Sequence, residues 1–217
     1  MKQSTWKYTL REILIVIVGI SIAFSMNKCS DNLKDNKLKT VYLTNLKSDA
    51  AADKLVLAKN IGEIDKKIET CYNLIPQLNT GKPQSMALLG EIFVILKYET
   101  FSPKDITYQT LVNSGDFKLI PDFELKAAIQ SHYSNYKDMI DAYARHRSLI
   151  QDYLGNYLVN DADYDQLNEG KALFLDEIKL KNIMRAMSTT LEDKKKAAQN
   201  GIVSCDQLIA ELEKALN

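Results

Sequence analysis

The chain has 217 residues, which is enough for one large domain or two small ones with a buried core. Its 28 basic and 28 acidic residues balance, and this argues against nucleic acid as a principal partner because phosphate binding needs a concentrated positive field. Only 8 glycines and 4 prolines interrupt long stretches of mixed polarity, which indicates long helices rather than sheets. Three cysteines are too few for a disulfide scaffold.

The first predicted element is a charge-free, largely apolar segment, residues 13–24. As a helix it rises roughly 18 Å, and flanking aromatic and apolar side chains extend the apolar surface to about 20 residues, the length that crosses a bilayer. We therefore predict a membrane anchor over residues 1–26, with the lipid bilayer as a partner. Gly19 and Ala23 lie four residues apart and offer a small-residue face for close contact between two such helices.

The same segment has features of a cleavable signal peptide and of a lipoprotein leader. The basic start and the Ala-Phe-Ser sequence at residues 23–25 are typical of a cleavable signal peptide. A lipoprotein leader needs a small residue before the modified cysteine, whereas here Lys28 precedes Cys29. We favour a retained anchor because the sequence after Met26 continues without proline or glycine as far as Gly62, as if one helix left the membrane unbroken.

Beyond the anchor we predict an all-α domain over residues 27–217, an elongated antiparallel helical bundle. A stalk helix over 27–78 is indicated by apolar residues at alternating steps of four and three, the spacing of one helix stripe: Leu57, Ile61, Ile64, Ile68, Cys71, Ile75 and Leu78. A turn with glycine and proline ends this helix. Continuing from the anchor, the stalk would be roughly 75 Å long at 1.5 Å per residue.

Two short helices follow. The first, over 85–97, is apolar nearly all round, so we predict that it lies in the core. The second, over 103–114, is indicated by Ser102 as its N-cap and Pro103 in its first turn. Gly115 is free to adopt the left-handed backbone conformation that closes such a helix.

Two long amphipathic helices, over 121–159 and 175–216, complete the predicted bundle. The core stripe of the first is Leu125, Ile129, His132, Tyr136, Met139, Tyr143, His146, Ile150 and Tyr153. The core stripe of the second is Leu180, Met184, Met187, Leu191, Lys194, Ala198, Gly201, Cys205, Leu208, Leu212 and Ala215. Because Gly201 costs helix propensity, we expect it to mark close approach to a neighbouring helix.

The relative directions of these helices bear on the cysteines. If the chain rises along the stalk, returns along 121–159 and rises again along 175–216, Cys71 and Cys205 lie within about 10 Å of each other along the axis. The two thiols would then be close enough to share a core layer, or to form a disulfide in an oxidising compartment, although a free cysteine is also a common small core residue.

Residues with catalytic or metal-binding potential are few. His132 and His146 lie fourteen residues apart on one helix face, about 21 Å along the axis, so they cannot share a metal within one chain. The common hydrolase, phosphate-loop and zinc-protease motifs are missing from the sequence. We therefore predict neither enzymatic activity nor a cofactor.

An acidic stretch between the two long helices is a weak candidate for a cation site. Its alternating carboxylates are those a hard cation such as Ca²⁺ prefers: Asp161, Asp163, Asp165 and Glu169. The spacing departs from that of an EF-hand, because Gln166 stands where the loop needs glycine and Ala172 where it needs glutamate. A solvated connector is the simpler interpretation.

Residues 107–136 read TYQTLVNSGDFKLIPDFELKAAIQSHYSNY and predict a hinge between helices. Its candidate interaction residues are Tyr108, Ser114, Gly115, Tyr133 and Tyr136. Together with EILIVIVGISIAF near the N-terminus, this stretch resembles a family of uncharacterised bacterial proteins that have one N-terminal span and a helical domain of about this size. The resemblance implies a cytoplasmic N-terminus and an exported domain, with no known activity.

These observations predict a single-pass protein of the bacterial inner (cytoplasmic) membrane whose bulk domain is extracytoplasmic. We expect the domain to act as a scaffold that binds another protein or copies of itself through exposed helix faces. The alternative is an extracytoplasmic ligand- or signal-sensing module that uses the tyrosine-rich hinge or the acidic loop. A pocket lined by Tyr133, Tyr136 and Tyr143 would favour that alternative, although no small-molecule substrate can be identified.

Overall fold

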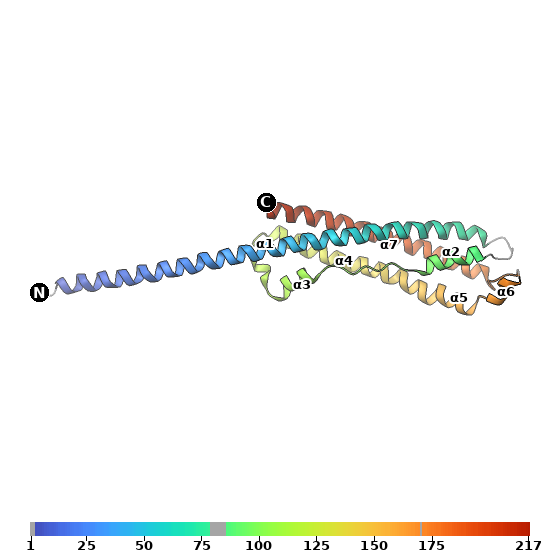
Figure 1. Cartoon of the computed structure of the whole chain (residues 1–217), viewed down its shortest axis with the longest axis horizontal. Helices are drawn as coiled ribbons and strands as arrows, with labels where there is room; N and C mark the ends of the chain where they lie inside the picture. The colour runs from blue at the N-terminus through green and yellow to red at the C-terminus, as the bar shows by residue number, and fades with distance from the viewer. Residues whose placement is uncertain (1–2, 79–85, 170) are drawn as a thin grey trace.

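The computed structural model describes residues 3–78, 86–169 and 171–217, and throughout these residues the protein is all-α, apart from one isolated β-bridge. The α-helices are α1 (Gln3–Gln77), α2 (Met86–Leu96), α3 (Ile106–Asn113), α4 (Phe123–Leu149), α5 (Asn156–Asn160), α6 (Tyr164–Asn168) and α7 (Glu177–Leu216). A 3-10 turn, η1 (Asp116–Leu119), precedes α4, and a π-helical turn, η2 (Ile150–Gly155), joins α4 to α5. The molecule is elongated, and α1 projects alone from one end (Figure 1).

Helix α1 is unbroken over 75 residues, about 112 Å at 1.5 Å per residue. Its described side chains are almost all exposed until Leu43, where burial against the other helices begins. Among the described residues, α1 alone is long and apolar enough to cross a membrane, judged by length and composition. We call residues 27–42, which lie between the apolar segment and the first buried residue, the neck.

Helix α7 runs antiparallel to α1, which corrects the predicted path of the chain. Three interhelical ion pairs set the register: Lys47 with Glu213 (2.8 Å), Lys54 with Asp206 (2.5 Å) and Asp65 with Lys195 (2.6 Å). Figure 1 shows the C-terminus beside the point where α1 enters the bundle. After α2 the chain returns along this bundle in an extended conformation, so α4 must rise parallel to α1 and α7 must descend.

The two cysteines are therefore not in one core layer. Cys71 lies six residues beyond Asp65 on α1, which places it level with about residue 189 of α7 in the antiparallel register. This level is sixteen residues from Cys205, or about 24 Å along the axis. Both thiols are buried and free, and they belong to different hydrophobic clusters.

The buried stripe of α1 also differs from the predicted one. Its members within the bundle are Leu43, Leu46, Ala50, Asp53, Leu57, Asn60, Ile64, Lys67, Cys71, Leu74 and Leu78. Ile61, Ile68 and Ile75, which the apolar pattern placed on this stripe, are only partly buried. The face of α1 that enters the core is thus rotated toward its polar residues Asp53, Asn60 and Lys67.

The stripe of α4 follows the sequence pattern as far as Ile150 and then shifts by one residue. The π-helical turn η2 has more residues per turn than an α-helix, so it moves Tyr153 out of the core and Leu154 into it. Tyr153 is 58% exposed, whereas Leu154 is completely buried. On α7 the predicted stripe is buried through Leu212, and Ala215 is exposed.

The close approach predicted at Gly201 is present. A β-carbon on this residue would lie 2.9 Å from both Leu57 Cδ1 and Met139 Sδ, so α1, α4 and α7 converge at this point. No side chain larger than hydrogen fits there without movement of a neighbour.

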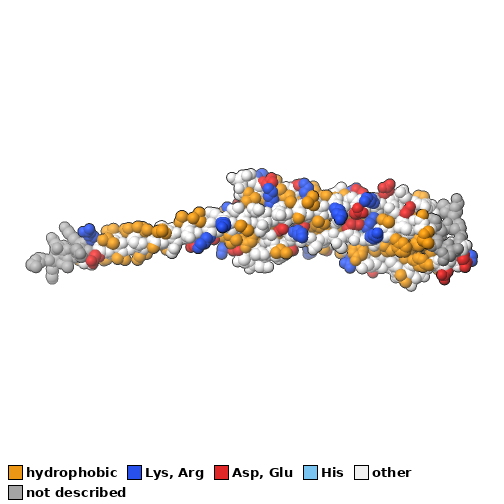
Figure 2. Space-filling model, viewed as in Figure 1, with side chains coloured by type: hydrophobic (Ala, Val, Ile, Leu, Met, Phe, Trp, Pro, Cys, Tyr) orange, Lys and Arg blue, Asp and Glu red, His pale blue; other side chains and the backbone are white. Residues whose placement is uncertain are grey.

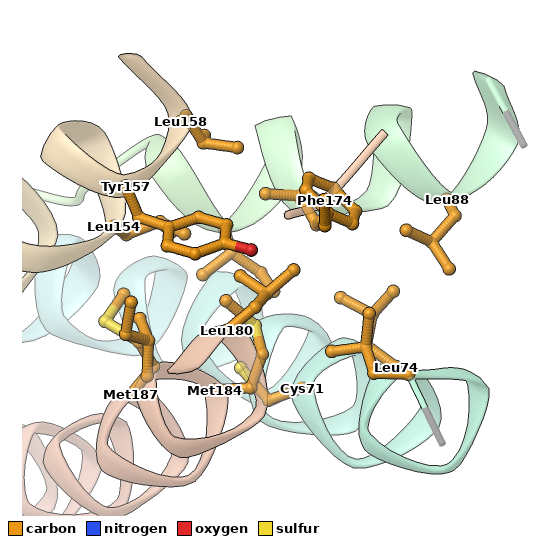
Figure 3. Close-up of a cluster of buried hydrophobic side chains, with 14 of the residues drawn as sticks. Cys71, Leu74, Leu88, Leu154, Tyr157, Leu158, Phe174, Leu180, Met184 and Met187 are labelled. Atoms are coloured by element: carbon orange, nitrogen blue, oxygen red, sulfur yellow. The ribbon is translucent and has the colours of Figure 1, made fainter. Parts of the chain in front are cut away.

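We call the end of the bundle from which α1 projects the near end and the opposite end the far end (Figure 1). At the far end, α2 and the loop before α7 cover a cluster of buried side chains. Figure 3 shows Cys71 and Leu74 of α1, Leu154 and Tyr157, and Phe174 pointing toward one another. Helix α2 contributes only one face: Leu88, Leu89, Ile92 and Ile95 are buried, but Phe93 and Val94 are 45% and 43% exposed. The helix thus joins the core as predicted, but through one face only, and Figure 2 shows apolar surface in the region of α2.

Helix α3 begins at Ile106, three residues later than predicted. Residues 97–105 between α2 and α3 form no helix or strand and run along the bundle as a drawn-out segment (Figure 1), and we call them the strap. Ser102 does not cap a helix, because the following Lys104 N–H is bound by a carboxylate of α1. Gly115 has φ of 75°, the left-handed conformation expected at the turn after α3.

Candidate functional site

The strap runs along α1 and is held there by side chains that the helix presents every seven residues. Each binds one backbone group of the strap: Lys67 donates to the Lys97 carbonyl, Asn60 donates to the Thr100 carbonyl (3.0 Å) and Asp53 accepts from the Lys104 N–H (3.1 Å). We call Asp53, Asn60 and Lys67 the polar ladder. Seven helical residues rise about 10.5 Å, which three or four extended residues also cover, so the two segments stay in register.

The ladder explains the rotated face of α1. An extended segment cannot satisfy its own N–H and C=O groups, and burying them without partners is costly. Polar side chains at the stripe positions of α1 supply the missing donors and acceptors. The isoleucines at the neighbouring positions cannot do so, and they lie at the edge of the core.

At the Lys67 end of the ladder, two lysines and one glutamate form a buried cluster. Glu99 binds Lys67 through Oε1 (2.5 Å) and Lys194 through Oε2 (2.8 Å), and the three side chains are 9%, 4% and 0% exposed. Lys194 also lies 4.4 Å from the centre of the Tyr143 ring. The cluster therefore joins the strap to α1, α4 and α7, and it carries one more positive charge than negative.

The pKa values of this cluster follow from burial and pairing. Burial by itself would raise the pKa of Glu99, but hydrogen bonds from Lys194 and Lys67 outweigh burial and hold that pKa below its ordinary value. Burial lowers the pKa of Lys194, and Glu99 opposes this shift. The paired, charged forms thus give two ion pairs that link Glu99 of the strap to α1 and α7.

At the other end of the ladder, Asp53 is the centre of a second group of contacts. Tyr136 of α4 donates to Asp53 Oδ2 (3.0 Å), and its hydroxyl also contacts Cys205 Sγ (3.3 Å). Burial raises the pKa of Asp53, against the hydrogen bonds from the Lys104 N–H and Tyr136. Burial likewise raises the pKa of the Cys205 thiol, which keeps it protonated and unreactive.

The two histidines link α4 to α7 by separate contacts. His132 Nδ1 pairs with Ser204 Oγ and His146 Nδ1 with Thr190 Oγ1, both at 2.9 Å. Burial lowers the pKa of each imidazole to about 4. Both Nε2 atoms are buried with no hydrogen-bond partner among the described residues, so each ring is neutral at ordinary pH.

The hinge tyrosines come together at the near end of the bundle. Tyr108 stacks on Tyr133 at 4.2 Å between ring centres, and Tyr133 meets Tyr136 edge-on at 5.9 Å. Ser114 Oγ accepts from the Asp116 N–H (3.3 Å) beside Gly115. These residues close the turn between α3 and α4.

The space between Tyr136 and Tyr143 is not a ligand pocket. Phe101 of the strap packs against both rings, with centres 5.3 Å and 6.4 Å away. A pocket lined by Tyr133, Tyr136 and Tyr143 would have favoured a sensing function, but the chain fills this position with its own side chain.

The carboxylates of the acidic loop are directed to different partners. Asp161 pairs with Lys179 (2.5 Å), Glu169 pairs with Lys171 (2.5 Å), and Asp163 accepts from the Asp165 N–H (3.1 Å). Among the described residues no three His, Cys, Asp or Glu side chains gather as a metal ion requires. The cation hypothesis thus receives no geometric support.

Two exposed features remain as candidate contact surfaces. In the apolar segment Gly19 and Ala23 face outward, and a β-carbon on Gly19 would meet nothing within 4 Å. At the far end a hollow of about 600 Å³ lies beside η2, lined by Leu149, Tyr153, Asp176, Ile178, Lys179, Asn182, Ile183 and Ala186. Sequence reasoning missed this hollow, which is lined in part by Tyr153, a residue that the sequence pattern placed in the core.

The polar ladder was also missed, although the sequence holds a signal for it. Asp53, Asn60 and Lys67 alternate with Leu57 and Ile64 at steps of four and three, which is the core spacing. A search confined to apolar residues passes over such positions.

Comparison with known proteins gives one match. A family described as a family of unknown function (DUF6090) matches residues 12–151, from the apolar segment through the strap and hinge into η2. Neither the curated proteins nor the solved structures gave a match. Because the matched region covers more than half of the chain, the protein belongs to this family of unknown function.

Proposed function

We propose that the protein is a single-span membrane protein that displays its helical bundle as a docking module for other proteins. The observation that carries the proposal is the continuity of α1. The same helix contains an apolar segment with fully exposed side chains and, from Leu43 onward, a face buried in the bundle. Exposed apolar surface of that length needs an apolar environment, which a bilayer supplies.

The proposed location is the inner membrane of a bacterium, with the bundle outside the cytoplasm. Long domains translocate largely regardless of nearby charge, and the resemblance noted in the sequence favours the same orientation. The small-residue face at Gly19 and Ala23 would allow two anchors to contact each other in the bilayer.

A docking role is supported by the contrast between a filled interior and an exposed apolar surface. The strap fills the space between the tyrosines, and the buried charged groups hold the strap, so the described interior is committed to structure. The far end, in contrast, exposes apolar side chains: Met86, Phe93, Val94, Tyr153, Leu175 and Ile178. These two facts favour protein binding over catalysis or small-molecule sensing.

The anchor and its orientation can be tested with a native thiol. Cys29 is exposed at the start of the neck, whereas Cys71 and Cys205 are buried. We expect the full-length protein to stay in membranes after a carbonate wash. A membrane-impermeant maleimide should label it in right-side-out spheroplasts, and Cys29→Ser should abolish the labelling.

Three results would contradict the proposal in different ways. Release into the carbonate supernatant would exclude the anchor. A mature N-terminus near Met26 would show a cleaved signal. Labelling only in inverted vesicles would reverse the orientation.

The docking role needs a separate test. A photocrosslinker at Phe93 should join the protein to another polypeptide in native membranes. The matched control is Ile106, which is 80% exposed and lies toward the opposite end of the bundle. Equal crosslinking from both positions, or none from Phe93, would remove the support for a far-end docking surface.

A further inference from the structure

The neck is a helix that lacks side-chain packing over most of its length. Residues 27–38 are exposed on every turn, and only Lys39 and Tyr42 are half-buried where the neck meets the bundle. Leu33 is 67% exposed in its middle. Residues 27–38 therefore gain none of the tertiary burial that stabilises most protein helices, whereas Tyr42 at the end of the neck packs on a buried cluster and donates to Asp116 Oδ2 (2.8 Å).

Its sequence is also poor at forming a helix alone. Ten of its sixteen residues are weak helix formers: Asn27, Cys29, Ser30, Asp31, Asn32, Asp35, Asn36, Thr40, Val41 and Tyr42. The serine, threonine, asparagine and aspartate side chains compete for backbone hydrogen bonds, and the Thr40 hydroxyl donates to the Asn36 carbonyl (3.0 Å). An isolated helix of about this length is marginal in water even with favourable residues.

Few side-chain interactions within the neck offset its weak helix propensity. Lys34 and Asp31 approach to 3.8 Å, but their side chains are 75% and 71% exposed, and an ion pair so exposed contributes almost nothing. The parts of α1 on either side of the neck have stabilising surroundings that the neck lacks: the proposed bilayer on one side and the bundle on the other. The apolar segment precedes the neck, and the segment from Leu43 onward is packed in the bundle.

We propose that the neck is a joint, a short stretch of α1 that opens and re-forms while the helix on both sides stays intact. Local opening is easiest where buried contacts are few and backbone hydrogen bonds are exposed, which describes the neck. The inference rests on the proposed membrane anchor, because a fixed end turns each opening into a change of bundle orientation. Since the packed part of α1 continues for about 53 Å beyond the neck, the exposed apolar side chains at the far end sweep a wide area.

Hydrogen exchange of the full-length protein in lipid nanodiscs tests this directly. We expect amides of the neck to exchange at least about 100-fold faster than amides of residues 46–74. Amides of residues 14–26 should be protected by the bilayer. Limited trypsin digestion should also cut at Lys28, Lys34 and Lys37 before it cuts within the bundle.

A variant with a stronger neck helix sharpens the test. Each asparagine-to-alanine change favours helix about threefold, so Asn27→Ala, Asn32→Ala and Asn36→Ala together should slow exchange in the neck about 30-fold. Asn45→Ala is the matched control, because Asn45 is exposed on the same helix within the packed region. It should leave exchange in the neck unchanged.

The outcomes separate the two proposals. Rapid exchange of residues 14–26 would overturn the membrane anchor. Protection of the anchor together with a neck as slow as residues 46–74 would overturn the joint and leave the anchor standing. In that case, loss of neck protection on dilution to one copy per disc would identify a second copy as the cover. An unchanged rate in the triple variant would show that weak helix formation is not the cause of opening.

Discussion

The substitution Glu99→Gln tests whether the buried cluster holds the strap. Glutamine keeps the shape and one acceptor oxygen but removes the charge that Lys67 and Lys194 share. All three side chains are at most 9% exposed, so water cannot replace the lost partner. Removing one member of a buried ion pair costs about 3–5 kcal/mol, a large part of the roughly 5–15 kcal/mol that stabilises a typical domain.

The assay is urea denaturation of the full-length protein in detergent, followed by far-UV circular dichroism. We expect Glu99→Gln to lower the free energy of unfolding by about 3–5 kcal/mol. The matched control, Glu91→Gln, alters an exposed carboxylate on α2 and should change it by less than about 0.5 kcal/mol. Lys194→Met should also cost less in the Glu99→Gln background than alone, by about 1 kcal/mol or more, because the pair is already broken.

Acid should reproduce the effect of the substitution. The pKa of Glu99 lies below its ordinary value, so the glutamate stabilises the folded state above its unfolded pKa. This contribution is lost as the pH falls through the lowered value, and the Glu99→Gln protein should lack that loss. If Glu99→Gln proves no more costly than Glu91→Gln, the lysines are hydrated and the cluster does not hold the strap.

Three further predictions concern packing and titration. Gly201→Ala should destabilise the bundle by about 1–3 kcal/mol, because its β-carbon would meet two neighbouring side chains. Gly62→Ala, where a β-carbon has open space, should stabilise the bundle by up to about 1 kcal/mol, and equal effects of the two changes in the same urea assay would contradict the close approach of three helices. Leu154→Ala should cost about 2–5 kcal/mol and Tyr153→Ala less than about 1 kcal/mol, and the reverse order would place the register shift of η2 in error. His146 has a pKa of about 4, so the unfolded chain binds its proton more readily and stability should fall from about pH 6.5 to pH 4. Thermal melts of His146→Asn should show a smaller loss over that range, and an identical loss would mean that another group titrates.

The interior of α1 shows where a pattern of apolar residues misleads. Ile61, Ile68 and Ile75 have the spacing of a helix stripe, and so do Asn60, Lys67 and Leu74 one position earlier. Both sets lie on adjacent arcs of the same helix, so periodicity alone cannot choose between them. The choice depends on the neighbour, and here the neighbour is an extended strap whose backbone needs polar partners.

The direction of α7 illustrates the same limit. The buried stripe of α7 can be predicted from the sequence because its members follow one another at steps of three and four residues. Whether the helix rises or descends depends on the strap, which returns the chain to the near end before α4 begins. The sequence around Ser102 and Pro103 resembles a helix start, so the extended strap was not predicted.

By itself, the sequence determined the helical class, the unbroken helix from the apolar segment into the bundle, and the buried faces of α4 and α7. These features arise from local periodicity and from the scarcity of proline and glycine, which act within a few residues. Only the tertiary structure decided the antiparallel course of α7, the outward turn of Tyr153, and the burial of Asp53, Lys67 and Glu99. Those features depend on contacts between segments far apart in the chain, because a buried charge or backbone group is tolerated only where a distant partner meets it.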